Sequence, residues 1–225
     1  MQIGLIGNGY WGKILLPKLE KLGNVKFICT SNKPYISELN SVDWVFIATP
    51  NDTHYNIVKT CLMQGVNVFC EKPLTLSYTS SLDLFRLAEL LKVKLYIDDV
   101  FNYRTEYKQI LDLDKNLSHK VYWSHPNINY YNNLYHDLYL MYHILNTNQP
   151  LQIKTDNGLQ INNITFEYKK SDIKEHYIND INLTHTVQSN DALYDMLDTV
   201  LNGEPNYLYN MQIALYCNKI IDKIK

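Results

Sequence analysis

GNGYWG, residues 7–12, follows directly after Gln2–Ile6, an apolar run typical of a buried strand. The hexapeptide matches G-x-G-x-x-G, the turn that places a pyrophosphate on the N-terminus of a helix. In this motif Gly7 permits the tight turn, Gly9 lets the backbone approach phosphate, and Gly12 lets the helix pack close to the strand. On its own the motif occurs more often as an ordinary glycine-rich loop. The strand before it and the helix after it favour a dinucleotide-binding turn.

Two further sequence segments follow apolar runs in the same way. They are ATPNDTH at residues 48–54 and Glu71-Lys72-Pro73. The carboxyl ends of parallel strands meet at one rim of a sheet, and ligands bind outside that rim. The three segments together therefore predict a cofactor turn, a second loop and a lysine on the same rim.

Strands alternate with helices over the first hundred residues, which predicts right-handed crossovers and a parallel sheet. The expected strands are Gln2–Ile6, Val25–Cys29, Val42–Ala48, Val66–Cys70 and Val93–Ile97, and the expected helices are Tyr10–Leu22, Asp52–Gln64 and Ser80–Leu91. Pro17 lies inside the first helix and is expected to kink or shorten it. Only a dozen residues separate Cys29 from Val42, so one strand-helix unit of a complete dinucleotide-binding fold is missing. We therefore expect the adenine end of a cofactor to be poorly enclosed.

After about residue 100 the pattern predicts a smaller α+β domain with a mostly antiparallel sheet. Its expected helices are 106–113, 134–145 and 192–201, and its expected strands are 121–124, 151–154, 159–161, 164–168 and 181–186. The fold class is thus α/β, a shortened Rossmann-type parallel sheet with a smaller α+β C-terminal domain. The expected domains are 1–99 for dinucleotide binding, 100–206 for substrate binding and oligomerisation, and 207–225 as a helix that packs back on the first domain.

Composition narrows the possible partners. The chain of 225 residues is 46% hydrophobic, enough for a sizeable core, and its net charge is −2 with no basic block, so nucleic acid is not an expected partner. No apolar run approaches the length of a membrane span. The first strand begins at once, which leaves no room for a signal peptide. The four cysteines lack metal-like spacing, so we expect reduced thiols, no metal site and a cytoplasmic protein.

The end of the second strand bears on the choice of cofactor. An acidic residue about 20 positions after the glycine turn would hold the ribose 2′-hydroxyl of NAD. This chain has Thr30, Ser31, Asn32 and Lys33 there instead. Hydroxyls, an amide and a lysine suit a 2′-phosphate better, which favours NADP over NAD. The alternative is that Lys33 is a solvated loop residue.

With these motifs the chain resembles the Gfo/Idh/MocA oxidoreductases, a family of NAD(P)-dependent sugar and cyclitol dehydrogenases. The matching text is GLIGNGYWGK at 4–13, VFIATPNDTHYNIVKTCLMQGVNVFCEKPLTLS at 45–77, YHDLYLMYHIL at 135–145 and the closing stretch Leu193–Lys225. The resemblance implies a Rossmann domain and a second domain whose open sheet forms a substrate wall and often an oligomer interface. A homodimer or higher oligomer is therefore expected. The segment Gly-Tyr-Trp-Gly-Lys is most similar to the corresponding segment of members that act on nucleotide-linked sugars.

By this resemblance Lys72 is the catalytic lysine that hydrogen-bonds the reacting hydroxyl or carbonyl. Reasoning from the residues agrees. Lys72 follows a strand end, and Pro73 keeps it out of helical geometry. A cation there would stabilise a developing alkoxide. The alternative is an ordinary surface lysine.

His136 matches the family histidine that serves as general acid and base, work that suits imidazole near neutral pH. We expect it near the start of a helix, with Asp137 as a first-turn carboxylate and His143 as a structural residue. The alternative is a capping or packing histidine. Asn132 stands where the family usually has aspartate; an amide can orient a substrate but cannot exchange a proton. Asn132 or Asn133 is alternatively an N-cap.

The motifs and the resemblance together give two sets of binding residues. The expected cofactor-binding residues are Gly7, Gly9, Tyr10, Trp11, Gly12, Thr30, Ser31, Asn32, Lys33, Thr49, Pro50, Asn51, His54, Glu71 and Lys72. The expected substrate-binding residues are Lys72, Asp99, Tyr103, Asn132 and His136. Asp98 and Asp99 end a strand on the same rim, where plain turn polarity is the alternative, and Asn51 is alternatively a helix cap.

Two functions remain open. The first is an enzyme that passes hydride between nicotinamide and a hydroxyl or keto carbon of a sugar or nucleotide sugar, for which we suggest the 3-position. The second is a non-catalytic regulatory or scaffold protein that binds dinucleotide or sugar. Lys72 and His136 favour the enzyme, whereas Asn132 and the missing strand-helix unit favour the second function.

Overall fold

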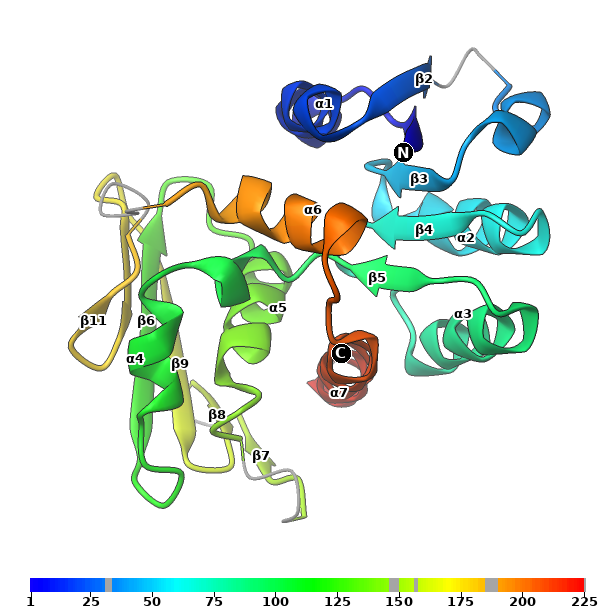
Figure 1. The fold of residues 1–225 in the computed structure, drawn as a ribbon. Coiled ribbons are helices and arrows are strands. Elements are labelled where there is room, and N and C mark those ends of the chain that lie inside the picture. Colours follow the sequence, from blue (N-terminus) through cyan, green and yellow to red (C-terminus); the bar gives the residue numbers. More distant parts are fainter. Residues whose placement is uncertain (31–33, 146–149, 156–157, 185–189, 225) are drawn as a thin grey trace. The chain divides into compact units, whose positions relative to one another are not determined.

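Residues 1–30, 34–145, 150–155, 158–184 and 190–224 are described by the computed structural model shown in Figure 1. They form two units. The first comprises Met1–Asp99 and Tyr194–Lys223, and the second comprises Val100–Leu193.

The first unit is built on a five-stranded sheet in which every neighbouring pair is parallel, in the order β2-β1-β3-β4-β5. Its strands are β1 (Gln2–Ile6), β2 (Asn24–Cys29), β3 (Trp44–Ile47), β4 (Asn67–Cys70) and β5 (Leu95–Ile97). Its helices are α1 (Tyr10–Leu22), α2 (His54–Met63), α3 (Tyr78–Leu91), α6 (Ala192–Asn202) and α7 (Tyr207–Ile224). The predicted α/β class is confirmed.

The connection between β2 and β3 holds only a 3₁₀ segment, Ile36–Ser41, whose Leu39 is fully buried. The predicted absence of one strand-helix unit is therefore confirmed. The expected shortening of α1 at Pro17 does not occur, because α1 runs unbroken from Tyr10 to Leu22. Pro17 and Lys13 are both exposed, so water can bond the Lys13 carbonyl that loses its donor.

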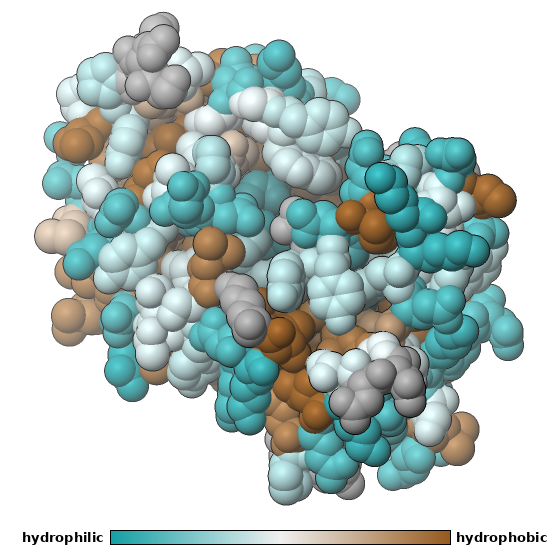
Figure 2. Space-filling model, turned by 180° about the vertical axis from the view of Figure 1, so that it is seen from behind, coloured by the Kyte–Doolittle hydropathy of each residue, from teal (hydrophilic) through white to brown (hydrophobic). Residues whose placement is uncertain are grey.

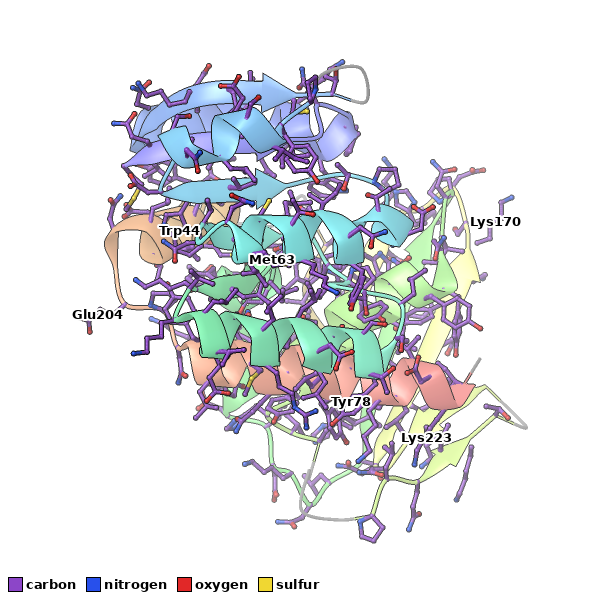
Figure 3. All side chains as sticks on the ribbon, turned by 90° about the vertical axis from the view of Figure 1, so that its right-hand side faces the viewer. Trp44, Met63, Tyr78, Lys170, Glu204 and Lys223 are labelled. Atoms are coloured by element: carbon purple, nitrogen blue, oxygen red, sulfur yellow. The ribbon has the colours of Figure 1, made fainter. Side chains whose placement is uncertain are left out.

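Side chains on one face of this sheet stack in register. Phe46 and Phe69 are paired residues of β3 and β4, and their ring centroids lie 5.0 Å apart. Tyr96 of β5 continues the row at 6.2 Å from Phe69, and Tyr207 of α7 meets Tyr96 edge-on at 6.0 Å. Figure 3 shows α2, α3 and α7 side by side.

Two asparagines fix α7 to the rest of the first unit. The Asn210 side chain accepts a hydrogen bond from the Ile97 N–H at 2.9 Å and donates one to the Ile97 carbonyl at 2.8 Å. It thus occupies both backbone groups of an edge-strand residue, as a further strand would. Asn218 donates to the Thr75 carbonyl at 3.2 Å and to the Ser81 hydroxyl at 2.8 Å.

The second unit contains a six-stranded sheet in the order β11-β10-β6-β9-β8-β7. Its strands are β6 (His119–His125), β7 (Ile153–Lys154), β8 (Leu159–Ile161), β9 (Ile164–Lys170), β10 (Glu175–Ile178) and β11 (Ile181–Asn182), and its helices are α4 (Tyr107–Leu111) and α5 (Tyr130–Met141). β6 and β9 pair in parallel and the other neighbours pair antiparallel. β10 had no counterpart in the sequence prediction, and α5 begins four residues before its predicted start.

No helix within the described ranges is long and apolar enough to cross a bilayer. On the face drawn in Figure 2, hydrophilic residues predominate and apolar residues form separate patches.

Replacing Asn210 tests whether its side chain takes the place of a further strand beside β5. We expect Asn210→Ala to lower the free energy of unfolding by about 2–4 kcal/mol, because a buried N–H and a buried carbonyl lose their partners. Urea unfolding followed by circular dichroism measures this loss. Asn202→Ala, at an exposed position of α6, is the control and should change stability by about 0.5 kcal/mol or less. Equal stability of the two variants would contradict this role of Asn210.

Candidate functional site

The three glycines of the turn between β1 and α1 occupy different environments. Gly7 has a φ of +100°, and a Cβ there would lie 2.4 Å from the Ala48 carbonyl oxygen. A Cβ on Gly12 would lie 2.0 Å from the Gly7 carbonyl oxygen. Around Gly9, in contrast, a Cβ would have no neighbour within 4 Å. Gly7 and Gly12 therefore allow close backbone packing, whereas Gly9 leaves open space in front of the helix.

The N-terminus of α1 is suited to an anion. Gly9 is the N-cap, no side chain among the described residues caps the helix, and the first turn carries no acidic residue. The first N–H groups of a helix point outward with a partial positive charge. A diphosphate in front of Gly9 would satisfy them.

A cavity of about 820 Å³ lies at this turn. Its walls come from the ends of β1, β2 and β3 and from the residues that follow them: Ile6, Gly7, Asn8, Gly9, Cys29, Thr30, Pro34, Tyr35, Ala48, Thr49, Pro50, Thr53 and Ile57. The volume is within the range of small-molecule and cofactor sites. Within the described residues, the Asn8 Oδ1 atom is buried and has no hydrogen-bond partner, which leaves an acceptor for a bound group.

The cavity brings together only part of the predicted cofactor set. Gly7, Gly9, Thr30, Thr49 and Pro50 line it. Gly12 lies behind it, against the Gly7 carbonyl. Ser31, Asn32 and Lys33, which are also predicted to bind cofactor, lie outside the described residues. Sequence reasoning did not single out Tyr35 or Ile57, because their approach to the cavity depends on the tertiary fold.

Tyr10 and Trp11 contact each other rather than the cavity. Their rings meet edge-on at 5.5 Å, and 77% of Tyr10 and 46% of Trp11 are exposed. Their backbone N–H groups belong to the first turn of α1, so any contact with phosphate would come from the main chain.

His54 is fully buried and joins two loops. Its Nδ1 lies 2.9 Å from the Pro73 carbonyl oxygen and its Nε2 lies 2.9 Å from the Thr49 carbonyl oxygen. Burial lowers the pKa of His54, and the two carbonyl oxygens partly offset this because they favour the ring with both protons. Both ring nitrogens contact the protein, so neither is available to a cofactor, and the predicted contact between His54 and a cofactor stays a prediction. The side chain instead ties the loop after β3 to the loop after β4.

The loop after β4 carries Lys72, which is half-buried, and its Lys72–Pro73 peptide bond is cis. The Glu71 N–H donates to the Ile47 carbonyl at 3.0 Å and so continues the pairing of β4 with β3 by one residue. His54 holds the loop at Pro73, and Asn218 of α7 holds it at Thr75. The backbone that carries Lys72 is therefore fixed from three sides.

Three carboxyl groups at this rim are almost completely buried. Glu71, Asp98 and Asp99 are 6%, 5% and 7% exposed. Asp99 accepts a hydrogen bond from the Tyr96 hydroxyl at 2.8 Å. Asn51, in contrast, is half-buried in a short 3₁₀ segment, Asn51–Thr53, that leads into α2.

In the second unit, His136 lies on α5 and its ring stacks on Phe101, with centroids 4.4 Å apart and an interplanar angle of 18°. Because α5 begins at Tyr130, His136 is its seventh residue. The expectation that His136 lies near the helix start is therefore wrong.

Asp137 is also not the first-turn carboxylate that we expected. It is fully buried, and its Oδ1 lies 2.7 Å from His176 Nε2 while its Oδ2 accepts a hydrogen bond from the Tyr168 hydroxyl at 2.7 Å. The His176 ring stacks on Trp123 at 4.0 Å. Burial and the neighbouring Asp137 raise the pKa of Tyr168 well above its usual value, so its hydroxyl remains a donor. Sequence reasoning missed His176 and Tyr168, which lie 39 and 31 residues from Asp137 and carry no local signal.

The remaining predicted substrate residues also lie in this unit. Asn132 is the third residue of α5, one turn before His136, and its side chain is outside the described features. Asn133 Oδ1 accepts a hydrogen bond from the Asn129 N–H just before the helix, which is a capping role. Tyr103 is half-buried at the end of a 3₁₀ segment, and its carbonyl accepts from Asn190 Nδ2 at 2.9 Å.

The glycine environments predict a contrast between two substitutions. We expect Gly12→Ala to lower the melting temperature by several degrees or to prevent folding, because the added carbon meets a backbone oxygen that cannot move freely. Gly9→Ala should melt within about 2 °C of the unchanged protein, since its φ is −76° and the space is open. Differential scanning fluorimetry measures both. A large loss for Gly9→Ala alone would reverse this assignment of the two glycines.

His54 provides a second stability test. We expect His54→Ala to lower the free energy of unfolding by about 2–4 kcal/mol, because two buried carbonyls lose their partner and a cavity forms. Asn56→Ala, an exposed position of the same helix, is the control. Urea titration of both variants measures the difference, and a loss below about 0.5 kcal/mol for His54→Ala would exclude the proposed tie between the loops.

Comparison with known proteins identifies the type of domain. A family model described as "Oxidoreductase family, NAD-binding Rossmann fold" matches residues 16–98. An inositol 2-dehydrogenase of Rhodococcus jostii is 40% identical over 73 residues, which cover 32% of this chain and 20% of that protein. A 2,7-anhydro-N-acetylneuraminate hydratase of Escherichia coli is 26% identical over 118 residues, which cover 44% of this chain and 32% of that protein. The chain thus matches about a fifth to a third of the length of these curated relatives.

Solved structures extend the likeness over the whole chain. A UDP-N-acetylglucosamine 3-dehydrogenase of Acidithiobacillus ferrooxidans superposes with a TM-score of 0.80 at 16% identity, covering 100% of this chain and 96% of that one. The WlbA dehydrogenase of Thermus thermophilus, solved with NAD and UDP-GlcNAcA, gives a TM-score of 0.77 at 14% identity, covering 100% and 94%. At these identities the structures show a shared fold. The predicted two-domain fold is confirmed.

Proposed function

We propose that this chain, a member of the Gfo/Idh/MocA oxidoreductases, is an NAD(P)-dependent dehydrogenase or ketoreductase that acts on a sugar or nucleotide sugar. The observation that carries the proposal is the open cavity at the glycine turn, on the same sheet rim as the fixed loop of Lys72. The dehydrogenases among the relatives support this class of reaction.

The residues at the cavity fit a dinucleotide. The open space at Gly9, the uncapped start of α1 and the unpartnered Asn8 oxygen would receive a diphosphate and its sugar. The nicotinamide would supply or accept the hydride. Thr30, which lies at the cavity where an acidic residue would favour NAD, supports a preference for NADP.

The chain's own residues would manage the oxygen and its proton. The Lys72 ammonium would hydrogen-bond the reacting oxygen and stabilise negative charge that develops there. The His136 imidazole would take the proton from a hydroxyl, or return it to a carbonyl oxygen. Asn132 would orient the substrate through its amide and exchange no proton. Stacking on Phe101 would hold the plane of the His136 ring.

A second function is a regulatory or scaffold protein that binds dinucleotide or sugar without turnover. The shortened crossover between β2 and β3 and the presence of Asn132 favour it. Turnover separates it from the enzyme.

Kinetics with paired substitutions test the proposal. We expect purified protein to oxidise NADPH stoichiometrically with a keto-sugar nucleotide. Lys72→Ala and His136→Ala should each lower kcat/KM by about 10²–10³-fold, the usual effect of losing a charge-stabilising or proton-transferring group. Lys21→Ala, an exposed lysine of α1, is the control.

Cofactor binding is measured in the same variants by quenching of tryptophan fluorescence, with NADPH and NADH in parallel. The two catalytic variants should still bind cofactor. Binding without turnover across a panel of free and nucleotide-linked sugars would favour the regulatory protein. Absence of cofactor binding would exclude the enzyme and leave only a regulatory or scaffold protein that binds sugar.

A further inference from the structure

Two buried carboxyl groups face each other at the ends of neighbouring strands. Cys70 of β4 and Ile97 of β5 are paired, and the Asp98 N–H donates to the Cys70 carbonyl at 2.9 Å. Glu71 and Asp98 therefore follow their strands at the same level of the rim. Their side chains are hydrogen-bonded to each other, and both are more than nine-tenths buried.

A hydrogen bond between two carboxyl groups requires a proton on one of them, because two carboxylates are both acceptors. Two negative charges on neighbouring carboxyl groups in a buried site would also repel each other strongly. Within the described residues, Glu71 Oε1 is buried and has no hydrogen-bond partner. A charge on that oxygen would have no donor to stabilise it.

The groups that face Glu71 reinforce this conclusion. Burial, followed by Asp98, raises the pKa of Glu71 well above its usual value, and Lys72 offsets this only in part. The Cys70 thiol is also close, but burial raises its own pKa well above the usual value, so it stays neutral. Starting from two protons, the pair therefore loses the first one more easily than the last one.

We propose that Glu71 and Asp98 share one proton at neutral pH and that this shared proton keeps the loop of Lys72 in its working position. The inference rests on the proposed function only for its effect on turnover. While the proton is present, one negative charge remains, and Lys72 attracts it. When the proton is lost, two buried carboxylates repel each other at the start of the loop that carries Lys72. Glu71 is thus a positioning residue for Lys72.

The stability of the protein as a function of pH tests the shared proton without any turnover. A carboxyl group whose pKa is raised by folding stabilises the folded state relative to the unfolded state at low pH. That contribution is lost as the pH rises from the unfolded pKa through the folded one. Glu71→Gln removes this loss, because an amide stays neutral and still donates to Asp98.

We therefore expect the melting temperature of Glu71→Gln, relative to the unchanged protein, to rise by about 5 °C or more between pH 5 and pH 9. Asp83→Asn, at an exposed carboxylate of α3, is the matched control and should show no such rise. Difference infrared spectra should contain a protonated-carboxyl band at neutral pH that Glu71→Gln abolishes. A pH-independent difference in melting temperature, or absence of that band, would overturn the proposal.

The pH profile of kcat tests the positioning role. The unchanged protein should lose activity on the alkaline side, whereas the kcat of Glu71→Gln should hold to higher pH. Identical alkaline limbs would overturn this role. If the protein proves inactive but the infrared band and the stability difference are present, the dehydrogenase proposal fails and the shared proton stands. If turnover is found without the infrared band and the stability difference, the shared proton is excluded and the dehydrogenase proposal stands.

Discussion

The hydrogen-bond ladder of the parallel sheet continues one residue past the ends of β1, β3, β4 and β5, and the arrangement of the rim depends on this. Backbone N–H groups of the first residues after the strands donate to the neighbouring strand ends: Gly7 to Cys29, Ala48 to Ile6, Glu71 to Ile47 and Asp98 to Cys70, at 2.8–3.0 Å. Because the strands pair in register, these four residues lie at one level. The glycine turn, the Thr49 loop, the Lys72 loop and the buried carboxyl pair start from the same row.

Buried polar side chains then hold the loops that follow these strand ends. A loop that leaves a sheet has backbone groups without partners, and these are costly when buried. His54 serves two of them, at Thr49 and Pro73, and Asn218 serves another at Thr75. Each of these side chains comes from a helix packed on the sheet. The helices therefore do more than cover apolar strands, because they also hold the rim loops in the shape that the strand ends impose.

The strands and helices of the first unit could be predicted because apolar runs and turn residues mark them in the local sequence. β1 and α1 were predicted with the bounds that the structure has, since apolar runs and glycines mark their ends. β10 was missed because Glu175–Ile178 is only four residues long and has a single aliphatic residue, so its alternating burial cannot be read from the residue types. The predicted start of α5 lies four residues too late because Tyr130–Asn133 contains no apolar repeat. The roles of His54 and Asp137 could not be predicted, because their partners lie far along the chain and are chosen by packing. Lys72 and His136 were found from the motifs and the family resemblance, and their chemical roles stay predictions.

The missing strand-helix unit affects one side of the sheet. It would follow β2, which is now an edge strand, so its absence changes the surroundings of Thr30 and of the adenine end. Pro34 and Tyr35 of the short crossover supply a wall there instead. The ends of β3, β4 and β5 lie on the other side of β1 and keep their full ladder. Shortening at β2 should therefore weaken the hold on the cofactor more than the placement of Lys72. A loss of affinity and a loss of chemistry are separate consequences in this fold, and the first does not entail the second.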